Sequence, residues 1–185
     1  MMNSDNGHIE TVVALCKQGE NKGRKELFEM FSSSMKALCY RYVGNVQDAE
    51  DLMIEGFISV YENIDKYRQG NFVGWMKRIM INNCLMFLKK EKNYNKKNTD
   101  YFYQQNEEEV TVENEARFTK QEIFKALDSL PKSFRTIFNL SVMDGYSHGE
   151  ICQMLNVENI TVRATLYKAK CMLKRELIKI EKQRK

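Results

Sequence analysis

Hydrophobic residues along much of this chain recur every three or four positions, the spacing that places side chains on one face of an α-helix. A first helix is predicted between Leu27 and Tyr42. Its apolar positions are Leu27, Phe28, Phe31, Met35, Leu38, Cys39 and Tyr42. The apolar positions of a second helix are Ala49, Leu52, Met53, Phe57, Val60, Tyr61 and Ile64. A third helix is predicted from about Phe72 to Lys90, and the three predict a helical bundle over residues 1–92.

Residues 93–116 show no such period. From Asn93 to Asn114 the chain carries two Lys against five Asp or Glu, with runs of Asn and Gln between them. A segment of this kind buries too little apolar surface to fold, so we predict a flexible acidic linker. Its aromatic residues, which leave transient docking on a partner open, are Tyr94, Tyr101, Phe102 and Tyr103.

Helical spacing returns in residues 117–185, which we predict to form a second small domain. Pro131 separates its first two helices, because proline cannot continue a helix through its interior. The apolar positions of these two helices are Ile123, Phe124, Leu127, Phe134, Ile137, Phe138 and Val142. Asp144-Gly145 ends the second of them, since glycine readily takes the left-handed closing conformation.

A helix-turn-helix is predicted at the end of the chain. Ser147, with Glu150 three residues later, makes a capping box for a short helix to Leu155. A turn at Asn156–Glu158 leads into a long final helix. Its apolar positions are Val162, Leu166, Ala169, Leu173, Leu177 and Ile180. A short helix, a tight turn and a long helix are typical of this motif.

Composition supports an all-α protein of two small domains. The 185 residues include one Pro and nine Gly, and few stretches alternate between apolar and polar residues. The net charge is only +4, but Thr161–Lys185 carries nine Lys or Arg against two Asp or Glu, which suggests a polyanionic partner. The five cysteines form no close pair. Without a signal-peptide pattern or a membrane-length apolar run, we expect a soluble cytoplasmic protein with reduced thiols and no membrane insertion.

The final helix carries candidate DNA-reading residues on the side opposite its apolar face. They are Thr161, Arg163, Ala164, Thr165, Tyr167 and Lys168. Arginine reads guanine edges or phosphates in a major groove, and small side chains approach a thymine methyl. The alternative is that this basic row is only a solvated helix face.

A second candidate site lies on the third helix, where Arg78, Asn82 and Lys89 form a polar row bordered by Trp75. The preceding loop adds Lys66, Arg68 and Asn71. An aromatic ring beside cations and an amide suits stacking on unpaired bases. The alternative is that Trp75 belongs to the core.

No catalytic set competes with these sites. His8 lies in a start that we expect to be disordered, and His148 lies in the first turn of a helix. Neither has ligand partners at metal-binding spacing, and no glycine-rich phosphate loop is present. We expect no enzymatic activity, no cofactor, no metal and no small-molecule substrate. The acidic group around Asp48 and Glu55 is interpreted as a helix-dipole cluster or a docking surface.

Taken in order, these blocks resemble the sigma factors of the extracytoplasmic-function (ECF) group, in the sigma-70 family, over nearly the whole chain. The first block is Asp48-Ala49-Glu50-Asp51-Leu52 with Glu55 and Phe57. The second block comprises Phe72, Trp75, Arg78, Ile79 and Asn82. The third block comprises Leu130-Pro131, Gly145-Tyr146-Ser147-His148, Glu150-Ile151, Leu155 and Thr161-Val162-Arg163.

The resemblance implies a protein that binds core RNA polymerase and directs promoter recognition, strand opening and transcription initiation. The clamp helices of the largest subunit would bind Asp48, Asp51, Leu52, Glu55 and Phe57. The melted minus-ten element would contact Lys66, Arg68, Asn71, Trp75, Arg78, Asn82 and Lys89. The last helix would read the minus-thirty-five element, with the flap of the second-largest subunit and an anti-sigma factor as further partners.

This chain departs from the family pattern at several positions. Asn156 and Glu158 stand where Gly and a capping Ser or Thr are common. Asn still tolerates the left-handed turn, but Glu is a poorer cap. Ile160 replaces a common Gly, and Ala164-Thr165 replace a common Ser-Arg pair, which removes one expected DNA contact. Gly56 replaces a frequent small hydroxyl or apolar residue in the second helix and is expected to soften it slightly.

Two other functions fit parts of the sequence. A polymerase-independent helix-turn-helix regulator would use the N-terminal bundle as a sensor or dimerisation module, and would bind a symmetric operator tightly by itself. A helical protein-interaction module without a DNA role would show no salt-dependent DNA binding. The acidic block at Asp48–Glu55 argues against the regulator, because a sensor has no need of it.

Overall fold

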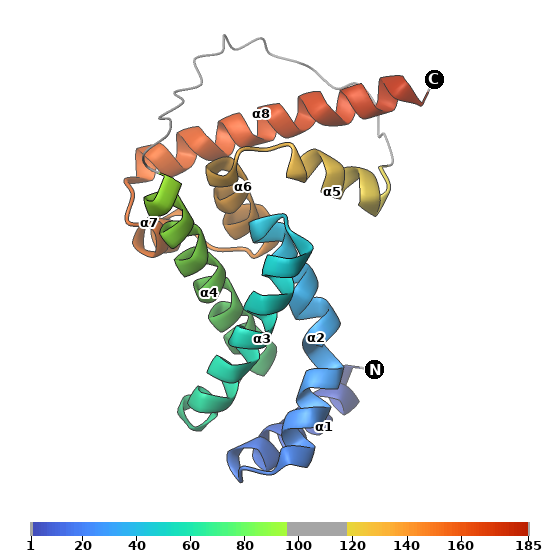
Figure 1. Ribbon diagram of the computed structural model, residues 1–185, viewed down its shortest axis with the longest axis vertical. Coiled ribbons are helices and arrows are strands. Elements are labelled where there is room, and N and C mark those ends of the chain that lie inside the picture. The colour runs from blue at the N-terminus through green and yellow to red at the C-terminus, as the bar shows by residue number, and fades with distance from the viewer. Residues whose placement is uncertain (1, 96–117, 185) are drawn as a thin grey trace. The chain divides into compact units, whose positions relative to one another are not determined.

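A computed structural model of the protein describes residues 2–95 and 118–184. Every regular element in those residues is helical, as the sequence predicts (Figure 1). The elements are α1 (Met2–Lys17), α2 (Asn21–Val43), α3 (Val46–Asn63), the 3₁₀ turn η1 (Ile64–Lys66), α4 (Phe72–Asn95), α5 (Lys120–Asp128), α6 (Lys132–Phe138), the π-helical turn η2 (Asn139–Met143), α7 (His148–Leu155) and α8 (Asn159–Gln183).

The chain divides into two compact units, residues 1–94 and 95–185. Helix α4 continues to Asn95, so the first three residues of the predicted linker, 93–95, are helical. The rest of that segment, including Tyr101, Phe102 and Tyr103, lies outside the described residues.

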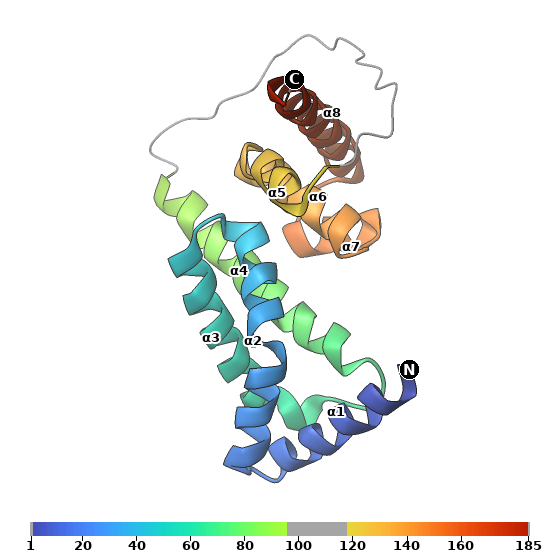
Figure 2. The ribbon, with the colours of Figure 1, turned by 90° about the vertical axis from the view of Figure 1, so that its right-hand side faces the viewer.

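A tight reversal of the chain pairs α2 with α3 in the first unit. Gly44 ends α2 with a φ of 71°, and its N–H donates to the Tyr40 carbonyl at 2.8 Å. Asn45 then caps α3, its side-chain oxygen accepting from the N–H groups of Gln47 at 2.8 Å and Asp48 at 3.2 Å. Because both helix ends are satisfied locally, the two helices pack side by side (Figure 2).

A hydrogen bond at Tyr61 and a close approach at Gly56 fix the position of α3 relative to α2 and α4. The Tyr61 hydroxyl donates to the Arg24 carbonyl of α2 at 2.9 Å. Burial raises the pKa of Tyr61 to about 12, so the hydroxyl keeps its proton at neutral pH. Gly56 is buried, and a Cβ there would run into the thioether of Met80 on α4. The glycine that the sequence suggested as a softening of α3 therefore allows α4 to approach closely.

The structure corrects the expectation that the chain begins with a disordered segment, because its first residues form α1. Its Val12, Val13 and Cys16 are buried, and α1 packs on α2 and on η1. His8 lies within this helix, with its Nε2 atom 3.1 Å from a carboxylate oxygen of Glu26. The apolar positions of α1 cover fewer than two turns, too short a run to indicate a helix from periodicity alone.

The second unit follows the predicted helix signals closely. A capping box of Thr119 and Glu122 opens α5, and the one predicted for Ser147 and Glu150 opens α7. Gly145 has a φ of 76° and Asn156 a φ of 53°, so both take the left-handed conformation expected of them. Glu158 begins α8 without a side-chain capping bond, as expected of a poorer cap.

Helix α8 organises this second unit by contacting α5, α6 and α7 (Figure 1). Its far end is tied to the start of α5, where the Arg184 guanidinium donates from Nε to Glu122 at 2.6 Å and forms a salt bridge with the same carboxylate. The hydrogen bonds from Arg184, followed by those from Thr119, lower the pKa of Glu122 to about 2. The sequence did not predict this long-range ion pair.

Close packing of α1 on α2 yields a first prediction. A Cβ on Gly23 would lie 2.6 Å from Leu15 Cβ and 2.9 Å from the Cys16 backbone nitrogen, and backbone cannot move aside as a side-chain end can. We expect Gly23→Ala to destabilise the first unit by about 1–3 kcal/mol, the usual cost of overpacking. Urea unfolding followed through Trp75, the one tryptophan of the sequence, measures this.

Gly7→Ala is the matched control, since Gly7 also lies in α1 and a Cβ there meets nothing within 4 Å. It should leave stability unchanged or raise it by up to about 1 kcal/mol. A Gly23→Ala protein as stable as the parent would contradict the α1–α2 packing.

Candidate nucleic-acid interface

Three aromatic rings cluster at the start of α4. The Trp75 ring lies 5.4 Å from Tyr67 and 5.7 Å from Phe72, and the Tyr67 and Phe72 rings meet edge to face at 5.1 Å. Phe72 is buried, whereas Trp75 and Tyr67 are half-buried. Trp75 therefore packs against the core while remaining partly exposed, which fits both of the interpretations that the sequence left open.

Positive and polar side chains are exposed along α4 and in the segment before it. Arg78, Asn82 and Lys89 are exposed on α4, and Lys66 and Arg68 are exposed in the segment before it. Lys66 donates to the Asn63 side-chain oxygen at 2.7 Å.

Asn71, which the sequence predicts to contact DNA, accepts two hydrogen bonds from the first turn of α4. Its side-chain oxygen accepts from the Gly74 N–H at 2.9 Å, and its carbonyl accepts from the Trp75 N–H at 3.0 Å. Asn71 therefore caps α4 and fixes the helix start that carries Trp75. The cap uses the side-chain oxygen of Asn71 and not its amide nitrogen.

On α3, the acidic residues of the predicted docking site reach the surface to different extents. Asp51 and Glu55 are exposed, and Asp48 is half-buried in the first turn. Glu50, their neighbour, pairs with Lys36 of α2 at 2.6 Å.

The apolar members of that predicted site are not on the surface. Leu52 is 3% exposed and Phe57 is 2% exposed, and the Phe57 ring packs 4.9 Å from Phe28 and 6.1 Å from Tyr61. Phe28 of α2 packs against Phe57, and Leu52 lies at the base of the groove between α3 and α4, so neither side chain stands on the outer face of α3. The large apolar side chains that α3 does expose are Val46, Ile54 and Ile58, and the sequence assigned none of them to the site.

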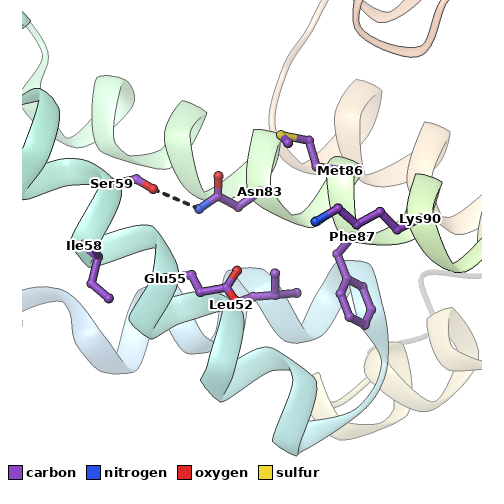
Figure 3. A pocket seen from close by; sticks show the side chains of 8 residues that line it. All are labelled: Leu52, Glu55, Ile58, Ser59, Asn83, Met86, Phe87 and Lys90. Atoms are coloured by element: carbon purple, nitrogen blue, oxygen red, sulfur yellow. Dashed lines mark hydrogen bonds between the residues drawn. The ribbon is translucent and has the colours of Figure 1, made fainter.

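An open groove of about 360 Å³ separates the exposed faces of α3 and α4 (Figure 3). Asn83 of α4 bridges it at one point by donating to the Ser59 hydroxyl of α3 at 3.4 Å. The groove is lined by Leu52, Glu55, Ile58, Ser59, Asn83, Met86, Phe87 and Lys90. It combines apolar walls with one carboxylate and one ammonium group, and only tertiary packing brings these residues together.

On α8, burial of one face leaves the predicted DNA-reading face in solvent. Val162, Leu166 and Ala169 are buried. The predicted residues Thr161, Arg163, Ala164, Tyr167 and Lys168 are exposed, and Thr165 is half-buried. Ile160, at the start of the same helix, is 71% exposed. Together with capped α7 and the turn at Asn156, this is a helix-turn-helix with an accessible second helix.

The described part of the chain holds no cluster of three or more His, Cys, Asp or Glu side chains suited to a metal ion. The five cysteines are free thiols. None of the described helices is long and apolar enough to cross a membrane.

Comparison with known families identifies two regions of the chain. The family model described as Sigma-70 region 2 matches residues 27–94, and the one described as Sigma-70, region 4 matches residues 120–173. The chain belongs to the sigma-70 family. Its relatives place it in the ECF group. Proteins of this family are in general non-enzymatic regulators of transcription.

Two relatives show how far the likeness extends. The ECF RNA polymerase sigma factor SigE of Mycolicibacterium smegmatis is 31% identical over 160 residues, which cover 83% of this chain and 61% of SigE. SigW of Bacillus subtilis is 28% identical over 190 residues, which cover 91% of this chain and 96% of SigW. This sigma factor therefore spans less than two thirds of SigE but nearly all of SigW.

Solved structures share the fold. The sigma factor RpoE from Bartonella quintana, in complex with the anti-sigma factor NepR, has a TM-score of 0.54 at 18% identity, covering 84% of this chain and 96% of RpoE. CnrH, in complex with the cytosolic domain of CnrY, has a TM-score of 0.50 at 14% identity, covering 90% of this chain and 95% of CnrH.

The burial of Phe57 yields a second prediction. We expect Phe57→Ala to lower the free energy of unfolding of the first unit by about 3–5 kcal/mol, because it leaves a cavity beneath α2. The neighbouring Ile58→Ala is the matched control and should change stability by less than about 0.5 kcal/mol, because Ile58 is 52% exposed. Urea unfolding monitored through Trp75 reports both. Unchanged stability in Phe57→Ala would restore Phe57 as a surface residue.

Proposed function

We propose that this sigma factor binds core RNA polymerase and gives it promoter specificity, with each structural unit contacting a different promoter element. The observation that carries the proposal is the order of the two family regions along one chain, combined with an exposed basic face on α8. Neither unit needs tight DNA affinity alone, because joining both to one enzyme supplies a high effective concentration.

The second unit would recognise the minus-thirty-five element. The N-terminal half of α8 enters the major groove, where Arg163 reads a guanine edge or grips a phosphate and Ala164 approaches a thymine methyl. Tyr167 and Lys168 lie one turn further along and contact the backbone. The capping box of α7 supports this unit by fixing the start of the helix that precedes the turn.

The first unit would capture the opened minus-ten strand. The exposed part of the Trp75 ring offers a stacking surface for an unpaired base, and Arg78, Asn82 and Lys89 track the strand along α4. Lys66 and Arg68 add positive charge at the entry to this surface. Asn71 acts indirectly, by capping the helix.

Polymerase docking would use the exposed face of α3. Asp51 and Glu55 supply negative charge for a basic partner surface, and Ile54 and Ile58 supply apolar contact. Leu52 and Phe57 hold α3 in position from inside the core. This division follows the burial of the side chains and revises the role that the family resemblance gives to Leu52 and Phe57.

The remaining assignments follow from the family and extend to this chain as part of the proposal. It acts in the cytoplasm, where polymerase is, and catalyses no reaction itself. An anti-sigma factor holds it inactive, as the complex of RpoE with the anti-sigma factor NepR leads one to expect. The acidic linker suits a cationic channel of polymerase and discourages DNA binding by the free protein.

A polymerase-independent regulator is the rival function, and the two differ in what binds DNA. The sigma factor needs core polymerase for specific binding, whereas the regulator binds its operator tightly alone. The match to Sigma-70 region 2 favours the first, because a regulator has no use for a polymerase-binding unit.

Arg163→Ala tests the promoter contact and gives a third prediction. We expect it to weaken binding of the holoenzyme to promoter DNA by about 10- to 100-fold, the usual loss for a good base contact, with core polymerase affinity unchanged. Fluorescence anisotropy with labelled promoter and with labelled sigma factor measures the two affinities separately.

Lys179→Ala is the control for Arg163→Ala, since Lys179 is exposed on the same helix but lies beyond reach of the bases. It should change promoter affinity less than about threefold, as expected for one backbone charge. Equal loss of promoter and polymerase binding in Arg163→Ala would refute the assigned role. Tight specific binding by the wild-type protein without polymerase would favour the independent regulator.

A further inference from the structure

Helix α1 touches the segment that leads to the base-capturing surface. Its last residue, Lys17, donates from Nζ to the Tyr67 carbonyl at 2.9 Å, across 50 positions of sequence. The same ammonium group lies 5.5 Å from the centroid of the Tyr67 ring. One side chain therefore holds both the backbone and the ring of Tyr67, through a charge-assisted hydrogen bond and a cation–π contact.

Tyr67 in turn organises the loop before α4. Its hydroxyl donates to the Gly70 carbonyl at 2.8 Å, and its ring contacts both Phe72 and Trp75. Gly70 has a φ of 140°, a backbone conformation that favours glycine. The path of residues 67–71 and the placement of the Trp75 ring thus both depend on where Tyr67 is held.

The packing of α1 fixes the position of Lys17. Val12 and Cys16 of α1 are buried, and Gly23 lets α2 approach the backbone of α1 within van der Waals distance. Helix α1 also packs directly on η1, the turn that precedes Tyr67. Lys17 is therefore placed by a packed helix rather than by the loop that it contacts. The family match begins at residue 27, after α1, so it assigns no role to this lysine.

We propose that Lys17 is a positioning residue for promoter opening, which sets the loop of residues 67–71 and the Trp75 ring before DNA arrives. A loop already held in its bound form loses less conformational entropy when a flipped base enters, so more of the binding energy is available to open the duplex. The proposal rests on the proposed function, since it concerns the same strand-capturing surface.

The test uses Lys17→Met, which keeps the aliphatic stem but removes the charge and the hydrogen-bond donor. On fully duplex promoter, we expect the mutant holoenzyme to open DNA about fivefold less well, the loss suited to one exposed cation–π and hydrogen-bond pair. On the same promoter with an unpaired minus-ten bubble, at holoenzyme concentrations that saturate the template, the loss should be less than about twofold, because no base pairs have to be broken. Permanganate footprinting and run-off transcription measure the two cases.

Two further variants make this test specific. Lys17→Arg should restore most of the opening, because arginine provides a charge, a donor and a cation–π contact. Lys22→Met, at an exposed lysine early in α2, should match the wild type. Equal loss on duplex and bubble templates, or failure of Lys17→Arg to restore opening, would overturn the proposal.

A second readout does not depend on transcription. Trp75 is the sole tryptophan, so its emission in the free protein reports the ring placement directly. We expect a changed emission maximum and greater acrylamide quenching in Lys17→Met but not in Lys17→Arg or Lys22→Met. Unchanged emission in Lys17→Met would overturn the positioning role and indicate a direct phosphate contact instead. If the wild type supports no transcription while this pattern holds, the proposed function fails and the structural role of Lys17 stands.

Discussion

Burial of Val162, Leu166 and Ala169 against the rest of the second unit fixes the rotation of α8 about its own axis. Successive residues of a helix are about 100° apart, so this burial forces Arg163 and Tyr167 outward. The same constraint governs α3, where the core takes Phe57 and leaves Ile58 in solvent. In both units the proposed interface is the face that the core does not use, so core packing decides which residues are accessible to a partner.

Helix boundaries were predictable from the sequence wherever a local motif specifies them. The capping box at Ser147, the break at Pro131 and the left-handed turn at Gly145 depend on residues close together in the chain, and all three are present in the structure. Helix α1 was missed, because its stability comes from packing on α2 rather than from its own periodicity. The π-helical turn that follows Phe138 was also missed, since one extra residue in a helix has no clear sequence pattern.

The candidate site was predictable in outline but not in the depth of each side chain. The pattern of residues around α3 alone does not show that Phe28 of α2 packs against Phe57. In the same way, the sequence of α4 alone does not show that the side-chain oxygen of Asn71 accepts a hydrogen bond at the helix cap. The contact of Lys17 with Tyr67 joins residues 50 positions apart and follows only from the packing of α1. Exposure and long-range contacts are tertiary properties. They distinguish residues proposed to bind a partner from residues proposed to position other side chains.

Run-off transcription on a library of promoter fragments, using core RNA polymerase with and without this protein, tests its role as a sigma factor most directly. The structure and family membership predict transcripts from a subset of promoters that appear only when the protein is present, and those promoters reveal the sequence that α8 and α4 recognise. No stimulation of transcription, together with tight specific DNA binding by the protein alone, would contradict that role and establish an independent DNA-binding regulator.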